Sequence, residues 1–241
     1  MLAMDANSLL TCWERGRSRH ALDRALLLHA FAAPDLSPDT LADRTLGERN
    51  AALLRFRQVL FGDMLSSCLN CPECNESLEF ALSVNALLAR EMKRATHVCV
   101  DGIQLRVPTT RDLVSISDEA DEVSAERKLL ERLVCVDQAS SSTNEGVIAM
   151  RGALHPERVT SALDEADPCI DLAVEVTCPA CAHAWNAPLD VAAFLWEEID
   201  ARARRLLDEV HVLARAYGWA ETQILQLTDA RRGAYLERVL A

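Results

Sequence analysis

Apolar residues recur every three or four positions along most of the chain, which predicts a mainly helical protein. The clearest repeat follows Asp190, a suitable N-cap, and keeps apolar residues on one helical face as far as Tyr217. Gly218 then stands where such a helix should end. Further helices are expected over residues 22–31, from 38 onward, 45–62, 110–116, 126–136, 157–163, 221–227 and 229–240.

Short apolar stretches between these segments predict strands over residues 78–82, 98–100, 104–107 and 170–176. Asp101-Gly102 separates the middle two and is a strong signal for a two-residue hairpin turn. The polar stretch 138–146 (QASSSTNEG) predicts a loop. Helices and strands together predict an α+β fold that is mostly helical.

Two C-P-x-C motifs carry the clearest chemical signal. Cys71 and Cys74 belong to the first, and Cys178 and Cys181 to the second. The two-residue gap lets both sulfurs of a tight turn face one ion, and two such turns supply the four soft ligands that Zn²⁺ prefers. We therefore expect these four cysteines to hold a structural Zn²⁺, because four thiolates leave no coordination position for water.

The layout around the motifs is that of a zinc ribbon, since a strand-like stretch with an aromatic residue follows each one, Phe80 in the first case and Trp185 in the second. The 103 residues between Cys74 and Cys178 far exceed the usual ribbon spacing of about 15–20. The ribbon is therefore expected to be split by an α/β insertion. The expected regions are an N-terminal helical region 1–65, a split ribbon 66–85 and 169–189, an insertion 86–168 and a C-terminal helical region 190–241.

Other readings of the cysteines stay open. Each C-P-x-C motif can instead be a separate reduced or redox-active pair. Cys68 is either an alternate ligand or a spare thiol, and His183 either replaces a sulfur or lies beside the site. The other cysteines are expected to be small buried apolar residues; they are Cys12, Cys99, Cys135 and Cys169. Replacing Cys74 or Cys178 is expected to unfold or aggregate the protein.

Charge and composition limit the possible functions. The 25 basic and 37 acidic residues give a formal charge of −12, which argues against non-specific binding to nucleic acid or anionic lipid. No membrane-spanning run or signal peptide is evident, so a cytoplasmic location is expected. The common nucleotide-binding and hydrolase motifs are absent. Arg15, Arg17 and Arg19 are expected in a solvated lead-in to the first helix, with a docking patch for an acidic partner as the alternative. Tyr217 and Trp219 are expected in the core.

A series of segments from about residue 46 to the end of the chain follows one order. The segments are 46–50 (LGERN), 53–57 (LLRFR), 61–62 (FG), the first motif with 78–80 (LEF), 167–168 (DP), the second motif with 183–185 (HAW), 189–191 (LDV), 194–199 (FLWEEI), 217–221 (YGWAE), 231–232 (RR) and 235–236 (YL). In this order they resemble the baseplate hub assembly chaperones of contractile phage tails and related injection systems. Two positions depart from the expected pattern, because Asn75 and Ala182 stand where glycine is expected after each C-P-x-C motif.

The resemblance implies a non-enzymatic role, in which the protein binds hub or baseplate proteins and helps them to assemble in the bacterial cytoplasm, without nucleic acid or membrane partners. The residues expected to contact the hub or baseplate protein are exposed apolar residues of the C-terminal helices, such as Trp196 or Leu207. The alternative is that these residues lie in the core. Two other functions stay open. One is that of a zinc-ribbon protein that binds nucleic acid or acts as a regulator, and the other is that of a metal-dependent or thiol-based enzyme.

Overall fold

The computed structural model describes residues 4–89, 95–135 and 154–240. The described part of the chain is mixed α/β and 58% helical, and its strands form three separate two-stranded antiparallel sheets. The predicted mixture of many helices with a few short strands is therefore confirmed. The predicted loop 138–146 lies outside the described residues.

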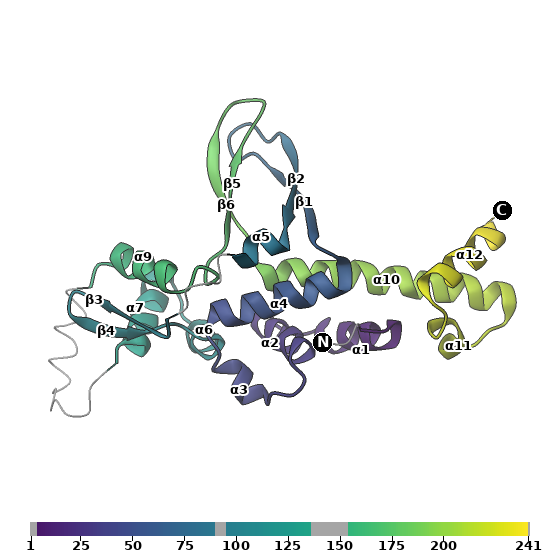
Figure 1. Cartoon of the computed structure of the whole chain (residues 1–241), viewed down its shortest axis with the longest axis horizontal. Helices are drawn as coiled ribbons and strands as arrows, with labels where there is room; N and C mark the ends of the chain where they lie inside the picture. Colours follow the sequence, from purple (N-terminus) through teal and green to yellow (C-terminus); the bar gives the residue numbers. More distant parts are fainter. Residues whose placement is uncertain (1–3, 90–94, 136–153, 241) are drawn as a thin grey trace.

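The chain begins with four helices and ends with three, and the strands lie between these two groups (Figure 1). The helices are α1 (Ala6–Gly16), α2 (Ala21–Ala32), α3 (Pro38–Ala42), α4 (Leu46–Phe61), α5 (Val84–Leu88), α6 (Thr110–Ile116), α7 (Glu122–Leu133), α9 (Pro156–Ala166), α10 (Val191–Tyr217), α11 (Glu221–Leu225) and α12 (Asp229–Leu240). The strands are β1 (Met64–Asn70), β2 (Ser77–Ser83), β3 (His97–Val100), β4 (Ile103–Arg106), β5 (Ala173–Thr177) and β6 (Ala184–Pro188). None of the described helices combines the length and the apolar character that a bilayer-spanning segment requires.

The helical body is built on α10, a helix of 27 residues against which α1, α2 and α4 pack (Figure 1). Its core includes Leu28 from α2, Leu54 from α4 and Ile199 from α10, all fully buried. Trp196 also belongs to this core, so its alternative role as an exposed contact is wrong, whereas Leu207 is 38% exposed. The apolar stripe of α10 thus holds the body together.

Capping residues mark the start of α4 and both ends of α10. Thr45 and Glu48 form a reciprocal capping box at the start of α4, and the Asp190 carboxylate accepts hydrogen bonds from two N–H groups of the first turn of α10. Gly218 adopts the left-handed conformation, with φ of 69°, at the end of α10. Such caps can be recognised in the sequence because each one involves only residues that are close together along the chain.

Other boundaries differ from the prediction. A helix, α1, precedes the first predicted one and contains Arg15, whereas Arg17 and Arg19 lie exposed between α1 and α2. The expected solvated lead-in is therefore confirmed for Arg17 and Arg19 only. Strand β1 and helix α5 were not predicted, because their short segments carry no clear period. Helix α7 begins at Glu122 because Asp121 caps it, four residues earlier than predicted. Strand β5 begins at Ala173 instead of 170.

The C-terminal helices attach to α10 through a buried arginine and an aromatic cluster. Arg232 is 1% exposed, and its Nε donates to Glu209 of α10 at 2.7 Å. Tyr217 and Trp219 stack with ring centroids 4.7 Å apart, and Tyr235 of α12 packs edge-on against both. Tyr217 is 39% exposed, so these aromatic residues join α10 to α12 at the surface instead of lying in the core.

The segment between the two C-P-x-C motifs has a small core of its own. Strands β3 and β4 pair around a turn in which Asp101 and Gly102 both have positive φ, of 53° and 80°, as the sequence predicts. Its buried residues come from this hairpin, from α7 and α9, and from Leu154, two residues before α9. They are Val100, Ile103, Leu105, Leu133, Leu154 and Val159.

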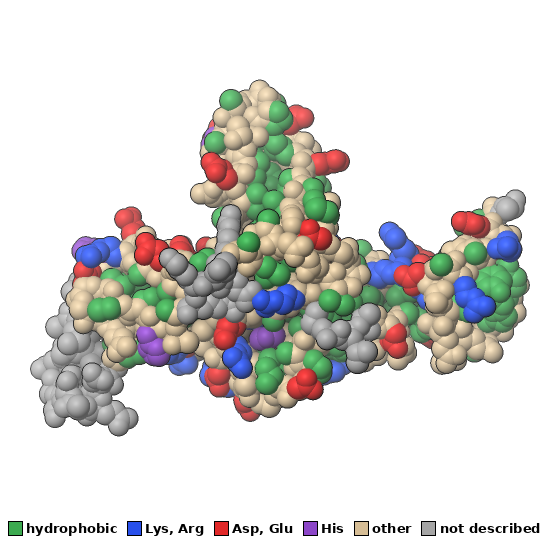
Figure 2. Space-filling model, viewed as in Figure 1, with side chains coloured by type: hydrophobic (Ala, Val, Ile, Leu, Met, Phe, Trp, Pro, Cys, Tyr) green, Lys and Arg blue, Asp and Glu red, His purple; other side chains and the backbone are tan. Residues whose placement is uncertain are grey.

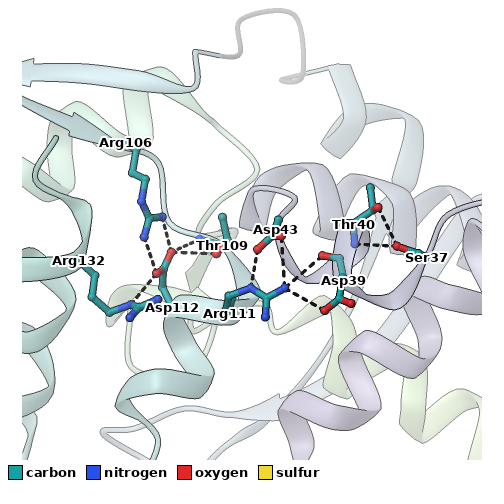
Figure 3. Close-up of polar contacts among 9 residues, drawn as sticks. All are labelled: Ser37, Asp39, Thr40, Asp43, Arg106, Thr109, Arg111, Asp112 and Arg132. Atoms are coloured by element: carbon teal, nitrogen blue, oxygen red, sulfur yellow. Dashed lines mark hydrogen bonds and ion pairs between the residues drawn. The ribbon is translucent and has the colours of Figure 1, made fainter. Parts of the chain in front are cut away.

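A buried carboxylate organises the end of this segment nearest the helical body (Figure 3). Asp112 is fully buried and accepts hydrogen bonds from Arg106, Arg132 and the backbone and hydroxyl of Thr109. Burial alone raises the pKa of Asp112, but these donors lower it well below its usual range. The carboxylate therefore stays ionised and joins β4, α6 and α7.

Helix α6, which contains Asp112, also contacts the helical body. Arg111 of α6 donates to Asp43 at 2.6 Å and to Asp39 of α3 at 3.3 Å (Figure 3). Thr45 and Thr109 form an isolated antiparallel β-bridge beside these ion pairs. Side-chain and backbone contacts therefore both fix the α/β segment against the start of α4.

The remaining two hairpins, β1–β2 and β5–β6, project side by side from the helical body, and we call them the hairpin pair (residues 64–83 and 173–188; Figure 1). No strand residue of the hairpin pair belongs to either hydrophobic core of the described chain. Apart from Leu65, which is buried at the base of β1, its strand residues are exposed or half-buried, largely in alternation. The hairpin pair therefore needs stabilisation from a source other than a hydrophobic core.

Candidate metal centre

Each C-P-x-C motif forms the turn of one hairpin in the hairpin pair. In the first turn, the N–H of Cys71 donates to the carbonyl of Glu76 at 2.8 Å, and the N–H of Asn75 donates to the carbonyl of Cys71 at 2.9 Å. In the second, Cys178 donates to His183 at 2.8 Å and Ala182 to Cys178 at 2.9 Å. The two turns thus share one backbone hydrogen-bond pattern, although they lie far apart in the sequence.

The residues that follow the motifs take the conformation that glycine would provide. Asn75 and Ala182 have φ of 60° and 59°, in the left-handed region that L-residues rarely adopt. Asparagine tolerates this region because its short polar side chain bonds locally, whereas alanine gains no such compensation. The departure from glycine therefore leaves both turns intact and places strain at Ala182.

The tips of the two hairpins bring four sulfurs together. The Sγ atoms of Cys71, Cys74, Cys178 and Cys181 all lie within 4.8 Å of one another. The closest pairs join one hairpin to the other, Cys71 to Cys181 and Cys74 to Cys178, each with an Sγ–Sγ distance of 3.6 Å. A disulfide is about 2.05 Å long, so no disulfide joins these sulfurs.

The thiols of the cluster do not ionise independently. Burial raises the pKa of Cys178, but N–H groups of Cys181 and Ala180 and the Cys74 thiol lower it to about 7. The N–H of Glu76 favours the thiolate of Cys74, yet desolvation and the neighbouring thiols raise the pKa of Cys74 to about 12. One thiolate therefore forms readily and opposes the next. A divalent cation at the centre would remove that repulsion and stabilise all four thiolates.

The geometry fits a tetrahedral ion. Four sulfurs at about 2.3 Å from a central metal are separated from one another by about 3.8 Å, close to the two shortest distances in the cluster. All four positions would then be filled by protein ligands. Such a closed site stabilises a fold but offers no place for a substrate or an activated water.

Two residues considered as additional ligands lie outside the cluster. Cys68 lies in β1 opposite Glu79, is exposed, and is not a member of the group of four. His183 stacks on Trp185 with ring centroids 5.6 Å apart, and its backbone carbonyl accepts the hydrogen bond from Cys178. His183 therefore supports the second turn through its backbone.

The other cysteines are only partly as predicted. Cys12 and Cys169 are fully buried, which confirms the expectation of small apolar residues in the interior. Cys99 is exposed on β3 and Cys135 is half-buried, so the expectation is wrong for Cys99. In the β3–β4 hairpin the alternation places Val100 inward, and Cys99 consequently points to the opposite side.

Comparison with known protein families, curated proteins and solved structures found no match for this chain.

Proposed function

We propose that the four-cysteine cluster binds a structural Zn²⁺ and that the hairpin pair is a split zinc ribbon. The observation that carries this proposal is the approach of four thiol sulfurs to within 4.8 Å at the tips of two hairpins of matching geometry. Zn²⁺ favours a closed tetrahedron of thiolates, and it is the common ion for such a donor set in proteins. Bound there, it would link the two hairpins, which lie outside both hydrophobic cores.

We further propose that the protein is a non-enzymatic assembly chaperone, or a baseplate-associated component, of a contractile phage tail-like particle. Support comes from the ordered resemblance of segments between residue 46 and the end of the chain to that family of chaperones. A metal site with four protein ligands suits a scaffold that binds other proteins. The formal charge of −12 favours partners with a basic surface.

The metal can be tested with a matched pair of serine variants. Cys74→Ser removes one of the four sulfurs, whereas Cys68→Ser changes an exposed thiol on the adjoining strand outside the cluster. By elemental analysis we expect one zinc per chain in the wild type and in Cys68→Ser, and loss of zinc in Cys74→Ser. Absence of metal from wild-type protein purified without chelators would contradict the proposal.

The same variants show how far the metal's influence extends. The sequence suggests general unfolding on loss of a ligand, but the hairpin pair lies outside the helical core. We therefore expect Cys74→Ser to keep most of its helical circular dichroism while residues 64–83 and 173–188 become open to proteolysis. Cys68→Ser should match the wild type in both measurements.

The assembly role can be tested by co-expression with the baseplate hub protein encoded in the same genome. We expect more soluble hub protein than in its absence, and recovery of the two proteins together. A genome without sheath, tube and hub genes would contradict the role, as would a hub protein whose solubility and purification are unaffected. Tight binding of a DNA or RNA duplex at low salt would instead favour the nucleic-acid-binding alternative.

A further inference from the structure

We propose that the hairpin pair is the surface on which the partner docks, and that the partner presents apolar side chains flanked by lysine or arginine. This inference rests on the proposed function, because it names the binding surface of the assembly role.

The hairpin pair carries apolar side chains that the rest of the described chain does not cover. Leu69 and Leu78 are cross-strand partners in the first hairpin, Val176 and Trp185 are partners in the second, and all four are only half-buried. None of the four belongs to a hydrophobic core. An apolar surface that its own chain leaves open is typical of a protein-binding site.

A hollow on the first hairpin gives this surface a specific shape. It is lined by Ser66, Ser67, Cys68, Glu79, Phe80 and Ala81. Successive strand residues point to opposite faces, so Phe80 and its neighbours Glu79 and Ala81 line the hollow from different faces of the hairpin. The hollow thus combines apolar residues with a carboxylate. Such a hollow suits an apolar side chain whose neighbour in the partner is a cation.

The charge of the hairpin pair has one sign. Its acidic residues, Glu73, Glu76, Glu79 and Glu175, are all exposed. No lysine or arginine occurs at residues 58–89 or 159–201, which include both hairpins and their flanks. The visible face in Figure 2 accordingly has green apolar side chains along its length and red acidic ones at its edges, with no blue. Four thiolates around a bound Zn²⁺ would add a further net charge of −2.

These glutamates differ from acidic residues elsewhere in the protein. Glu198 and Asp200 of α10 are paired with arginines, Arg57 and Arg204 respectively. By contrast, no lysine or arginine of the described residues lies within ion-pair distance of the four hairpin glutamates. Within the described part of the chain, no ion pair therefore neutralises these glutamates, and their negative field is available to a partner.

The sign of the charge selects the partner. Nucleic acid and anionic lipid are repelled by an acidic surface, and so is a second copy of the same hairpin pair. A basic segment with interspersed apolar residues would satisfy the carboxylates and cover the apolar positions together. The partner is accordingly a protein segment of that composition, such as a basic face of the hub protein.

The test compares charge reversals of equal size at two places. Glu79→Lys with Glu175→Lys reverses two carboxylates of the hairpin pair, and Glu122→Lys with Glu126→Lys reverses two exposed carboxylates of α7 as the control. Zinc content and thermal melting first establish that both variants are folded. Each full-length protein is then titrated with a fluorescent amphipathic Leu/Lys peptide and with an oligolysine of equal charge.

We expect the amphipathic peptide to bind the wild type and the α7 control equally, and the hairpin variant about tenfold more weakly. Binding should weaken as salt is raised, and the oligolysine should bind the wild type less tightly because it cannot fill the apolar hollow. Equal affinities for the hairpin variant and the α7 control would overturn the proposal. So would a failure of the peptide to bind the wild type at low salt.

Co-expression of the same variants with the hub protein separates this inference from the proposed function. Recovery of hub protein with the wild type and the α7 control, but not with the hairpin variant, supports both. Recovery with all three retains the assembly role and refutes the docking surface. If hub protein is never recovered while the peptide still distinguishes the variants, the assembly role fails and the docking surface stands.

Discussion

At the scale of single residues, the two positions after the metal-binding turns share a backbone conformation but not a side chain. Asn75 and Ala182 both have φ near 60°. The left-handed region costs an L-residue about 1–2 kcal/mol unless its side chain compensates, as asparagine does. Ala182 therefore lowers the stability of the second turn without altering its shape.

Ala182→Gly is expected to raise the free energy of unfolding by about 1 kcal/mol, because glycine adopts the left-handed region without steric cost. Urea denaturation of the metal-loaded protein measures the change. Ala184→Gly is the matched control, since Ala184 lies in β6 with an extended backbone. There glycine should destabilise slightly, and equal effects of the two changes would show that Ala182 is not strained.

A buried histidine offers a second residue-scale prediction. His29 of α2 is 3% exposed, and its Nδ1 has no hydrogen-bond partner among the described residues. Burial, together with the nearby charges of Arg49 and Arg44, lowers the pKa of His29 to about 4. The folded protein therefore keeps the imidazole neutral at a pH where the unfolded chain binds a proton.

Stability should consequently be highest above pH 6.5 and should fall by up to about 3 kcal/mol as the pH decreases towards 4. His29→Leu should remove that part of the pH dependence, because leucine has no proton to bind. Chemical denaturation at pH 7 and pH 5 provides the comparison, with the exposed His211→Leu as the control. An unchanged pH dependence in His29→Leu would contradict the assignment.

At the scale of secondary-structure elements, local signals were predictable and long-range ones were not. The capping residues Thr45 and Asp190 fixed the starts of α4 and α10, because a cap involves only the adjoining turn. The role of Asp112 had no such signal. Its partners Arg106 and Arg132 come from other elements, and only the folded chain brings them to one carboxylate.

Asp112→Asn is expected to destabilise the protein by about 3 kcal/mol, because two arginines lose their charged partner at a buried site. Asp43→Asn, which changes an exposed ion pair on α3, should have a much smaller effect. Thermal denaturation of both variants tests the difference. Since the pKa of Asp112 is lowered in the folded state, its contribution is present at neutral pH and lost as the pH falls below about 4.

At the scale of the whole molecule, the nine cysteines fall into environments that predict an order of reactivity. Cys68 and Cys99 are exposed and Cys135 is half-buried. Four more form the metal cluster. Cys12 and Cys169 are fully buried, and burial raises the pKa of Cys12 to about 12. The rate at which each thiol reacts therefore distinguishes the cysteines of the surface, the metal centre and the core.

Titration with a thiol reagent should give three stages in the native protein. Cys68 and Cys99 should react at once, with Cys135 more slowly, and a chelator should then release the four cysteines of the cluster. Cys12 and Cys169 should react only in denaturant. Mass spectrometry of the modified peptides assigns each stage, and fast reaction of the cluster in metal-loaded protein would contradict a closed site.

The sequence was sufficient to predict the ligand residues of the candidate site, but not the strands and faces that surround them. The spacing within each C-P-x-C motif identified Cys71, Cys74, Cys178 and Cys181, because two sulfurs in one turn have a local signature. Strand β1 lacked such a signature, so the first hairpin was only half predicted. The exposed position of Cys99 depends on which face of the β3–β4 hairpin packs inward, and composition alone does not determine that.

The distance along the chain between the two metal-binding turns has a consequence for synthesis. Ribosomes add about 5–20 residues per second, so the first pair of thiols leaves the ribosome roughly 5 to 20 s before the second pair. During that interval a nascent chain offers only two thiol sulfurs to a metal ion. The second hairpin, which would complete the metal site, has not yet been made. A metallochaperone or a thiol-protecting partner acting on newly made chains would have that window in which to work.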